Sequence, residues 1–461
     1  MKDLRTFIQY VEEKAPNHIV RVHKTVKAQY EIPAIISKLD RQNMFPTLVF
    51  ENVEGYEMPV LTNLYASRKG LAMALETTEK ELFKVYSTKM KNCLSPKLLE
   101  DGPIKEVIKE GEDVNLFELP IITYHEKDQG PFITAGAAVI KDNRTGLRNI
   151  GIYRMQLKGK DKLGIWPSRT SHIYDYYKRA QEENEPLEIA IIIGMHPAFY
   201  LGVMARNPLG IDEYEIIGGV LGEPLQVVQG ETVDLEVPAR AEIVIEGEIP
   251  PNLLEDEGPF GEVFGYYGPK MRNPIVNVKA ITRREDAFYH DISAPNIDHY
   301  MVGALPREAA VYDAVSRLTP SIPVKAVHVP PSGHGRLICY ISLKKLQEVD
   351  PKIAILAAFV ADAYLKYVVI VGDDVDIFNE SEVLWALVTR TRPNKDVILI
   401  PVASGSADPS SEDELPMRVG IDATRSLEAF GEKVTIPGVK EIVLEDYIKE
   451  EWLRSARSIC W

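Results

Sequence analysis

The spacing of apolar residues divides the chain into three parts. Near the start, apolar residues recur every three or four positions, as Leu4, Phe7 and Val11 show, and this spacing predicts an amphipathic helix. Further helical patterns follow, the longest of them over about 69–89, together with a short strand pattern. We therefore interpret residues 1–114 as an N-terminal α/β region.

The middle part, residues 115–305, follows a charged segment over 100–117 that we interpret as a linker. From there the apolar spacing changes to two, and runs such as 133–140 and 242–248 predict strands. A helical pattern interrupts them near 172–184. The middle part is therefore expected to be a mainly antiparallel sheet or barrel with one inserted helix.

In the last part, residues 306–461, helical and strand patterns alternate again. The runs 367–371 and 397–402 are apolar and β-branched, as is typical of strands that are buried on both faces. A stretch rich in Ser, Asp and Glu over 403–416 predicts a loop. The whole chain is expected to belong to the α/β (α+β) class, with a C-terminal α/β domain over 306–461.

Composition and charge narrow the range of functions. The 461 residues carry a formal charge of −15, which disfavours binding to a nucleic-acid backbone. The three cysteines lie far apart, so neither a zinc knuckle nor a disulfide framework is expected. No apolar run reaches the roughly 18 residues of a membrane span, and the N-terminus does not resemble a signal peptide. We therefore expect a cytoplasmic protein with neither membrane nor nucleic-acid partners.

Several common catalytic motifs are absent from the sequence. There is no GxGxxG after a strand, no P-loop and no GxSxG elbow. His125 and Glu126 begin a string like the HExxH of zinc peptidases, but Gln129 occupies the position of the second histidine. The nucleotide-binding and hydrolase classes therefore lose most of their support.

Two carboxylates flank a stiff turn in the segment Glu257-Gly-Pro-Phe-Gly-Glu262. Proline fixes φ and glycine permits unusual backbone, so the turn can hold both acids near one point. Two nearby carboxylates in different surroundings separate in pKa, and one of them can stay protonated as a general acid. A solvated polar hairpin corner fits the same residues, and spacing alone favours this second interpretation.

Four other polar positions could join the acid pair. Arg154 ends a strand pattern that begins at Asn149, and an arginine there could hold a substrate carboxylate. His172 starts the predicted inserted helix, and Glu213 precedes a Gly-Gly turn. Together, an asparagine, a histidine and a glutamate would give a mixed oxygen and nitrogen ligand set, which suits Mn²⁺ or Mg²⁺. Taken singly, each position has an ordinary alternative: a surface ion pair, a helix cap or an acidic loop.

Five strings, taken together, resemble one family. In chain order they are NIGIYRMQLKGKDKLGIWP, DEYEIIGGVLGEP, EGPFGEVFGYYG, VGDDVDIFNESEVLWALVTR and MRVGIDAT. They resemble the UbiD decarboxylases along nearly the whole chain, especially the hydroxyarylic and heteroaromatic acid decarboxylases of that family. The resemblance implies an N-terminal α/β region, a central split β-barrel that binds prenylated FMN, and a C-terminal α/β domain that mediates a homodimer or homohexamer.

The resemblance also implies a metal and flavin site. The metal ligands of the family fall on Asn149, His172 and Glu213, which would hold Mn²⁺ or Mg²⁺ against the flavin phosphate, with K⁺ close by. The sequence departs from the family at Ser171, where some members carry glutamine, and at Arg418, where many carry lysine. The expected flavin-binding positions are Asn149, Gly151, Ile152, Tyr153, Arg154, Ser171, His172 and Glu213.

The catalytic trio of the family falls on Arg154, Glu257 and Glu262. Loss of carbon dioxide from an sp² carbon leaves electrons that no side chain can accept. In this family prenylated FMN, supplied by a flavin prenyltransferase, takes them through a covalent adduct with the substrate. The resemblance implies that Arg154 orients the carboxylate, that Glu262 donates the proton and that Glu257 tunes both.

A further group of residues points to the substrate, a small carboxylic acid. His299, Arg307 and Arg336 fall where the substrate pocket of the family lies, and several cations would suit a second carboxylate, as in furan-2,5-dicarboxylate. A phenolic acid such as 4-hydroxybenzoate needs one hydrogen-bond partner and is the alternative. In a third interpretation the chain is a flavin- and metal-binding assembly factor without catalysis. If Arg307 begins a surface helix, it points to solvent instead.

Overall fold

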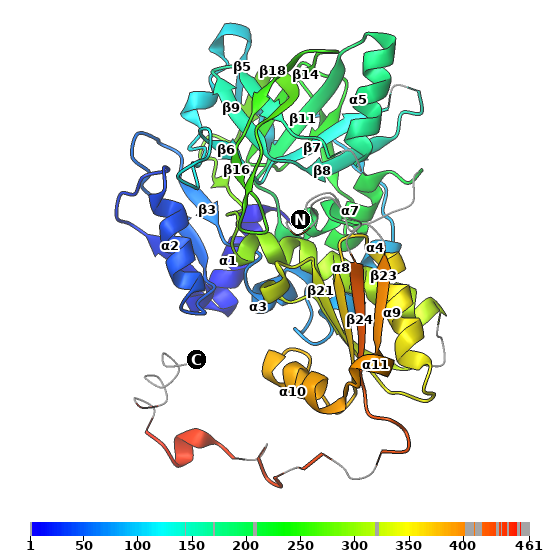
Figure 1. The fold of residues 1–461 in the computed structure, drawn as a ribbon. Coiled ribbons are helices and arrows are strands. Elements are labelled where there is room, and N and C mark those ends of the chain that lie inside the picture. The colour runs from blue at the N-terminus through cyan, green and yellow to red at the C-terminus, as the bar shows by residue number, and fades with distance from the viewer. Residues whose placement is uncertain are drawn as a thin grey trace.

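The computed structural model describes residues 2–142, 144–168, 171–205, 210–318, 322–401, 410, 417–429, 433–434, 436–439, 442–449 and 452. The predicted loop over 403–416 lies outside these residues, apart from residue 410. Three larger sheets follow one another in the body of the molecule, and Figure 1 shows the long helix α8 beside the last of them. No helix within the described ranges is both long and apolar enough to cross a bilayer.

The N-terminal region packs helices against a four-stranded sheet of order β1–β2–β3–β19. The last strand, β19 (Tyr289–His290), comes from far along the chain and pairs in parallel with β3. The predicted long helix over 69–89 is wrong, because Glu76 adopts a left-handed conformation (φ 58°) that ends the first of two helices. The other elements are α1 (Leu4–Lys14), β1 (Ile19–Val22), α2 (Glu31–Asp40), β2 (Thr47–Phe50), β3 (Val60–Thr62), α3 (Arg68–Leu75) and α4 (Leu82–Lys91).

The central part is a ten-stranded antiparallel sheet. Its main path is β6–β9–β10–β18–β14–β11–β7–β8, and β5 and β15 each pair with β18 beside this path. The path does not close on itself, so the sheet is open rather than a closed barrel. The predicted linker over 100–117 is wrong in part, because its residues 107–110 form a strand that pairs with β18. The strands are β5 (Val107–Glu110), β6 (Phe132–Ile133), β7 (Ala137–Lys141), β8 (Arg148–Ile152), β9 (Met155–Gly159), β10 (Lys162–Ile165), β11 (Leu187–Ile193), β14 (Ile243–Ile249), β15 (Leu254–Glu257) and β18 (Met271–Arg283).

Both faces of the central sheet are covered. In β11, Ile191 and Ala190 are each fully buried, although successive side chains of a strand point to opposite faces. The predicted inserted helix is confirmed as α5. The helices are α5 (His172–Glu183), α6 (Pro197–Val203) and α7 (Glu213–Leu221), and the smaller strands are β4 (Lys97–Leu98), β12 (Gln226–Gln229), β13 (Glu236–Pro238), β16 (Phe260–Gly261) and β17 (Tyr267–Gly268).

The C-terminal part is a five-stranded sheet of order β20–β21–β22–β24–β23, preceded by α8. Pro306 lies inside α8, so the boundary that we draw there falls within a helix. The predicted strands at 367 and 397 are confirmed, but β23 is an edge strand whose Leu399 is largely exposed. The elements are α8 (Ile297–Leu318), β20 (Val324–His328), β21 (Ile338–Leu343), α9 (Asp350–Ala361), β22 (Tyr367–Gly372), α10 (Glu380–Arg390), α11 (Pro393–Asp396), β23 (Val397–Pro401) and β24 (Met417–Ala423).

Candidate active site

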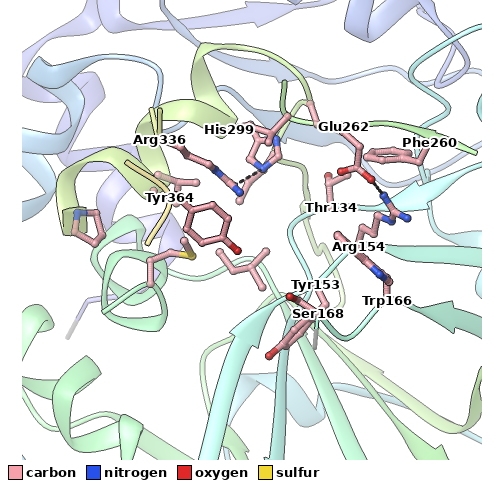
Figure 2. Close-up of a pocket in the computed structure, with 18 of the residues that line it drawn as sticks. Thr134, Tyr153, Arg154, Trp166, Ser168, Phe260, Glu262, His299, Arg336 and Tyr364 are labelled. Atoms are coloured by element: carbon pink, nitrogen blue, oxygen red, sulfur yellow. Dashed lines mark hydrogen bonds and ion pairs between the residues drawn. The ribbon is translucent and has the colours of Figure 1, made fainter. Parts of the chain in front are cut away.

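A cavity of about 330 Å³ lies where the central sheet, α8 and the C-terminal sheet meet. Its walls come from the segment that ends β8, from the β16–β17 hairpin, from α8, and from the loops that carry Arg336 and Tyr364. In Figure 2 the Arg154–Glu262 pair and the Arg336–His299 pair lie on different sides of this cavity. The cavity therefore has two polar ends, described in turn below.

At the first end, Arg154 joins the two acids of the stiff turn. Its Nε and Nη2 donate to the two carboxylate oxygens of Glu257, at 3.1 and 3.0 Å, and its Nη1 donates to Glu262. Glu257 is completely buried and also accepts a hydrogen bond from Asn273 Nδ2 (2.8 Å). A solvated hairpin corner is therefore excluded, and the three side chains form one charge-paired group.

The backbone break after β8 explains how Arg154 reaches this group. β8 ends at Ile152 and β9 starts at Met155, so Tyr153 and Arg154 escape strand alternation and both line the cavity. The guanidinium carbon of Arg154 lies 4.5 Å from the ring centroid of Trp166 and 5.3 Å from that of Phe260. Two aromatic rings and two carboxylates thus fix its orientation.

Glu262 is the acid of the pair that borders the cavity. Burial raises the pKa of its carboxyl above the ordinary value, although the charge of Arg154 and its hydrogen bond act in the opposite direction. Glu257, by contrast, is held at both oxygens by a guanidinium. The two acids therefore have different surroundings, as a proton donor and its partner require.

Asn149, His172 and Glu213 also come together. Asn149 Nδ2 lies 3.0 Å from Glu213 Oε2 and 3.2 Å from His172 Nδ1, and the His172 Nδ1 to Glu213 Oε1 distance is 4.0 Å. Burial raises the pKa of Glu213 to about 7. Within the part of the chain that the structure describes, the buried Asn149 Oδ1 has no hydrogen-bond partner. This orphaned oxygen, an imidazole nitrogen and a carboxylate fit a divalent cation such as Mn²⁺ or Mg²⁺.

The other positions expected to bind flavin divide into two groups. Ile152, Tyr153 and Arg154 line the cavity, whereas the remaining expected positions do not. A Cβ on Gly151 would meet the Tyr153 ring at 2.8 Å, so this glycine gives the ring room to fold back. The Tyr153 hydroxyl hydrogen-bonds to Ser171, which precedes α5. Tyr153 therefore connects the cavity to the helix that carries His172.

The second end of the cavity carries His299, Arg307 and Arg336. Arg336 Nη2 lies 3.3 Å from His299 Nε2, and because a guanidinium only donates, this nitrogen must accept. Burial lowers the pKa of His299 to about 3, so the ring is neutral and its proton lies on Nδ1. Nδ1 is buried and finds no hydrogen-bond partner among the residues that the structure describes.

Arg307 belongs to the same end and does not reach solvent. Its side chain is buried because α8 begins at Ile297, ten residues before it, and not at Pro306. Nη1 donates to the Gly303 carbonyl (2.7 Å), and Nε lies 3.0 Å from the buried carboxylate of Asp362. The alternative in which Arg307 points to solvent is therefore wrong.

Sequence reasoning missed several residues that shape the cavity. Trp166 lies inside a quoted motif but carries no signal for a guanidinium contact. Tyr364 lies with its ring 5.5 Å from the Arg307 guanidinium carbon and 5.9 Å from that of Arg336. Thr134 lines the cavity from the segment after β6. None of these contacts follows from local spacing, because each depends on how the strands and loops pack in three dimensions.

Three family models match successive parts of the chain. They are models of the UbiD family and are described as domains of 3-octaprenyl-4-hydroxybenzoate carboxy-lyase. The N-terminal domain matches residues 12–90, the Rift-related domain residues 97–296, and the C-terminal domain residues 300–423. Together they cover most of the chain.

Solved structures of the same family resemble the chain over nearly its whole length. The UbiD-class enzyme HmfF from Pelotomaculum thermopropionicum, in complex with FMN, matches with a TM-score of 0.92 and 39% identity over 97% of this chain and 100% of that chain. An evolved dimeric form of HmfF is in complex with prFMN. The 3,4-dihydroxybenzoic acid decarboxylase AroY from Klebsiella pneumoniae matches with a TM-score of 0.87 and 26% identity over 97% of this chain and 100% of that chain.

Among sequence relatives, the anhydromevalonate phosphate decarboxylase of Methanothermobacter thermautotrophicus is 33% identical over 426 residues, which are 92% of this chain and 97% of the relative. The predicted three-part fold is confirmed by the HmfF likeness. The family models, the solved structures and the sequence relative all lead to one assignment. The chain belongs to the UbiD family of decarboxylases, a family of carboxy-lyases.

Proposed function

We propose that the protein catalyses the reversible, non-oxidative decarboxylation of furan-2,5-dicarboxylate to 2-furoate. One observation carries the proposal: Arg154, Glu257 and Glu262 form a charge-paired group at one end of a cavity whose other end is cationic. The first end can hold the carboxylate that leaves and deliver a proton to carbon. The second end can hold a carboxylate that stays.

The cofactors implied by this reaction are prenylated FMN, Mn²⁺ or Mg²⁺, and K⁺. Asn149, His172 and Glu213 would hold the divalent cation, whose charge and the N-terminus of α5 would together favour the flavin phosphate. When bound, the flavin supplies the electron sink that no side chain provides. The HmfF structures hold FMN and prFMN, which supports this choice of cofactor.

The steps left to the chain are orientation and proton transfer. Arg154 is fixed by Glu257 and by two aromatic rings, so it can hold a substrate carboxylate without losing much further freedom. Glu262, whose pKa is raised by burial, would give a proton to the carbon that loses carbon dioxide. In the reverse direction Glu262 removes that proton, so high bicarbonate favours carboxylation.

The choice of a dicarboxylate rests on the second end of the cavity. The Nδ1–H of His299 and the guanidinium groups of Arg307 and Arg336 can donate to one carboxylate there. A phenolic acid such as 4-hydroxybenzoate would need only a single donor at this end. A phosphate could also use these cations, and the anhydromevalonate phosphate decarboxylases are relatives of the chain. A non-catalytic assembly factor would have no use for the buried acid pair.

The test begins with protein produced together with a flavin prenyltransferase. Mass spectrometry and an absorption spectrum should detect prenylated FMN. A panel should then include furan-2,5-dicarboxylate, 4-hydroxybenzoate, 3,4-dihydroxybenzoate and a phosphorylated aliphatic acid. We expect turnover of furan-2,5-dicarboxylate, and only with the modified flavin. Strong turnover of hydroxybenzoates without turnover of furan-2,5-dicarboxylate would contradict the proposed substrate. An unchanged KM for the dicarboxylate in Arg307→Ala would contradict the proposed role of Arg307 in binding it.

A further inference from the structure

The His125 string, which does not form a zinc site, packs directly against the acid-bearing turn. Asp128 Oδ1 accepts a hydrogen bond from the Gly261 amide (2.9 Å), and Asp128 Oδ2 lies 2.9 Å from His125 Nδ1. The Gln129 amide donates to the Pro259 carbonyl (3.1 Å). The loop over 125–129 thus holds the turn on both sides of Phe260, which lies two residues before Glu262.

This loop is itself rigid. The His125 amide donates to Asp128 Oδ2 (2.9 Å), and the Asp128 amide donates back to the His125 carbonyl (3.1 Å). The Asp128 carboxylate is fully buried and receives three donors, so its position is fixed from several directions. The His125 ring packs edge-on against Phe260, whose own ring contacts the Arg154 guanidinium.

We propose that His125 and Asp128 are positioning residues for the reaction, which fix the Gly261 amide and so hold Glu262 against Arg154. Glu262 itself is held by the hairpin, since its amide donates to the Tyr266 carbonyl (2.8 Å) and its carbonyl accepts from the Gly265 amide (2.9 Å). With Asp128 in place, the backbone on either side of the acid is tied down. The proposal rests on the role of Glu262 in the proposed function, and it names residues to which the family resemblance assigned no role.

Gly261 supplies a steric test of this contact. A Cβ built there would lie 2.3 Å from His125 Nδ1, 2.5 Å from Cε1 and 2.9 Å from Cγ, so the three nearest atoms all belong to the His125 ring. Gly261→Ala must therefore displace this ring or the turn. If the ring is first removed by His125→Ala, the added methyl group has room. The two substitutions should consequently interact strongly.

The experiment compares His125→Ala, His125→Asn, Asp128→Ala, Gly261→Ala and the double variant His125→Ala/Gly261→Ala, all loaded with prenylated FMN. His125→Asn keeps a donor near the position of Nδ1, and His23→Ala at the surface is the control. For each we measure kcat and KM on the acid that the parent turns over best, FMN affinity by fluorescence, and thermal unfolding.

We expect His125→Ala and Asp128→Ala to lower kcat by roughly 10- to 100-fold, the cost of misplacing a reacting group by about 1 Å, with KM and FMN affinity within about twofold. His125→Asn should retain most of kcat. Gly261→Ala should cost more in the parent than in His125→Ala. The proposal is overturned if both alanine variants keep parental kcat, if kcat falls only together with FMN affinity and thermal stability, or if the two substitutions add independently. A parent that decarboxylates no acid contradicts the proposed function instead, while the unfolding temperatures still test the contact.

Discussion

At the scale of single residues, the site is a set of charges whose partners are fixed by direct hydrogen bonds. Glu257 and Arg154 form a two-point ion pair, which fixes the orientation of both groups. Glu262 shares only one bond with the same guanidinium and faces the cavity. The spacing of the turn predicted that both acids lie close together. It could not predict Asn273, Trp166 or the other partners, because their contacts depend on how distant strands pair.

Glu262→Gln should abolish decarboxylation and leave flavin binding intact. Glutamine keeps an oxygen that can accept from Arg154, but it has no acidic proton to give to carbon, so we expect kcat to fall by about 10²- to 10⁴-fold. Turnover, exchange of substrate hydrogen with deuterium oxide, and FMN fluorescence are measured together. Glu248→Gln, on a surface ion pair with Lys279, is the control. Near-parental exchange in Glu262→Gln would assign the proton to another group.

His299→Ala should weaken the binding of a dicarboxylate specifically. Its buried Nδ1–H would donate to a charged oxygen, and loss of such a bond costs about 1.5–3 kcal/mol. We therefore expect KM for furan-2,5-dicarboxylate to rise by roughly tenfold or more with a smaller change in kcat. Decarboxylation of 2-furoate, whose single carboxylate would be the one that leaves, should change little. Equal effects on both compounds would show that His299 does not discriminate between them.

At the scale of elements, period-two and helical patterns predicted what kind of structure each stretch forms, but not its edges. The stretch over 100–117 looked like a linker because charges separate its apolar residues, yet β5 adds to the sheet through backbone pairing that side chains do not specify. The long helix over 69–89 divides at Glu76. Likewise, α8 runs through Pro306, and this continuity brings His299 and Arg307 to one cavity.

A prediction for the central sheet concerns the bulge in β18 opposite Gly247 of β14. The register between β14 and β18 shifts at Gly247, and a Cβ there would lie 2.2 Å from the Asn277 carbonyl oxygen. Gly247→Ala should therefore lower the free energy of unfolding by about 1–3 kcal/mol, as overpacking usually does. Gly159→Ala in the same sheet meets no atom closer than 3.8 Å and is the matched control. Denaturant unfolding measures both, and equal stabilities would mean that the bulge relaxes freely.

At the scale of the whole molecule, the three parts are joined by buried polar contacts as well as by apolar packing. Glu308 in α8 pairs with Arg68 of α3 and lies 2.8 Å from His328 of β20, so one carboxylate connects the N-terminal and C-terminal parts. Leu356 and Val360 of α9 are 49% and 83% exposed, one helical turn apart. Such exposure is compatible with the expected homodimer or homohexamer, which stays a prediction that a mass measurement in solution can test.

Asp291 gives the molecule a pH dependence that can be measured. It accepts hydrogen bonds from Thr62, Tyr124 and Thr134, and burial raises its pKa to about 6 from 3.8. Because the folded state holds this proton more tightly, the stabilisation is complete below about pH 4 and is lost as pH rises through about 6.

Asp291→Asn cannot titrate, so its stability relative to the parent should improve between pH 4 and 7, by up to about 3 kcal/mol. Unfolding of both proteins across this pH range provides the comparison. A constant difference between them would mean that Asp291 has the same affinity for its proton in the folded and unfolded states.

The position of β19 has a consequence for how the chain is made. β3 is paired on one side by β2. Its other side pairs with residues 289–290, which are translated only after the whole central sheet. A nascent chain that ends before that point carries an N-terminal sheet with an open edge on the ribosome. A separately expressed fragment of residues 1–114 would keep this edge, and we expect it to aggregate unless the later strand is supplied in trans.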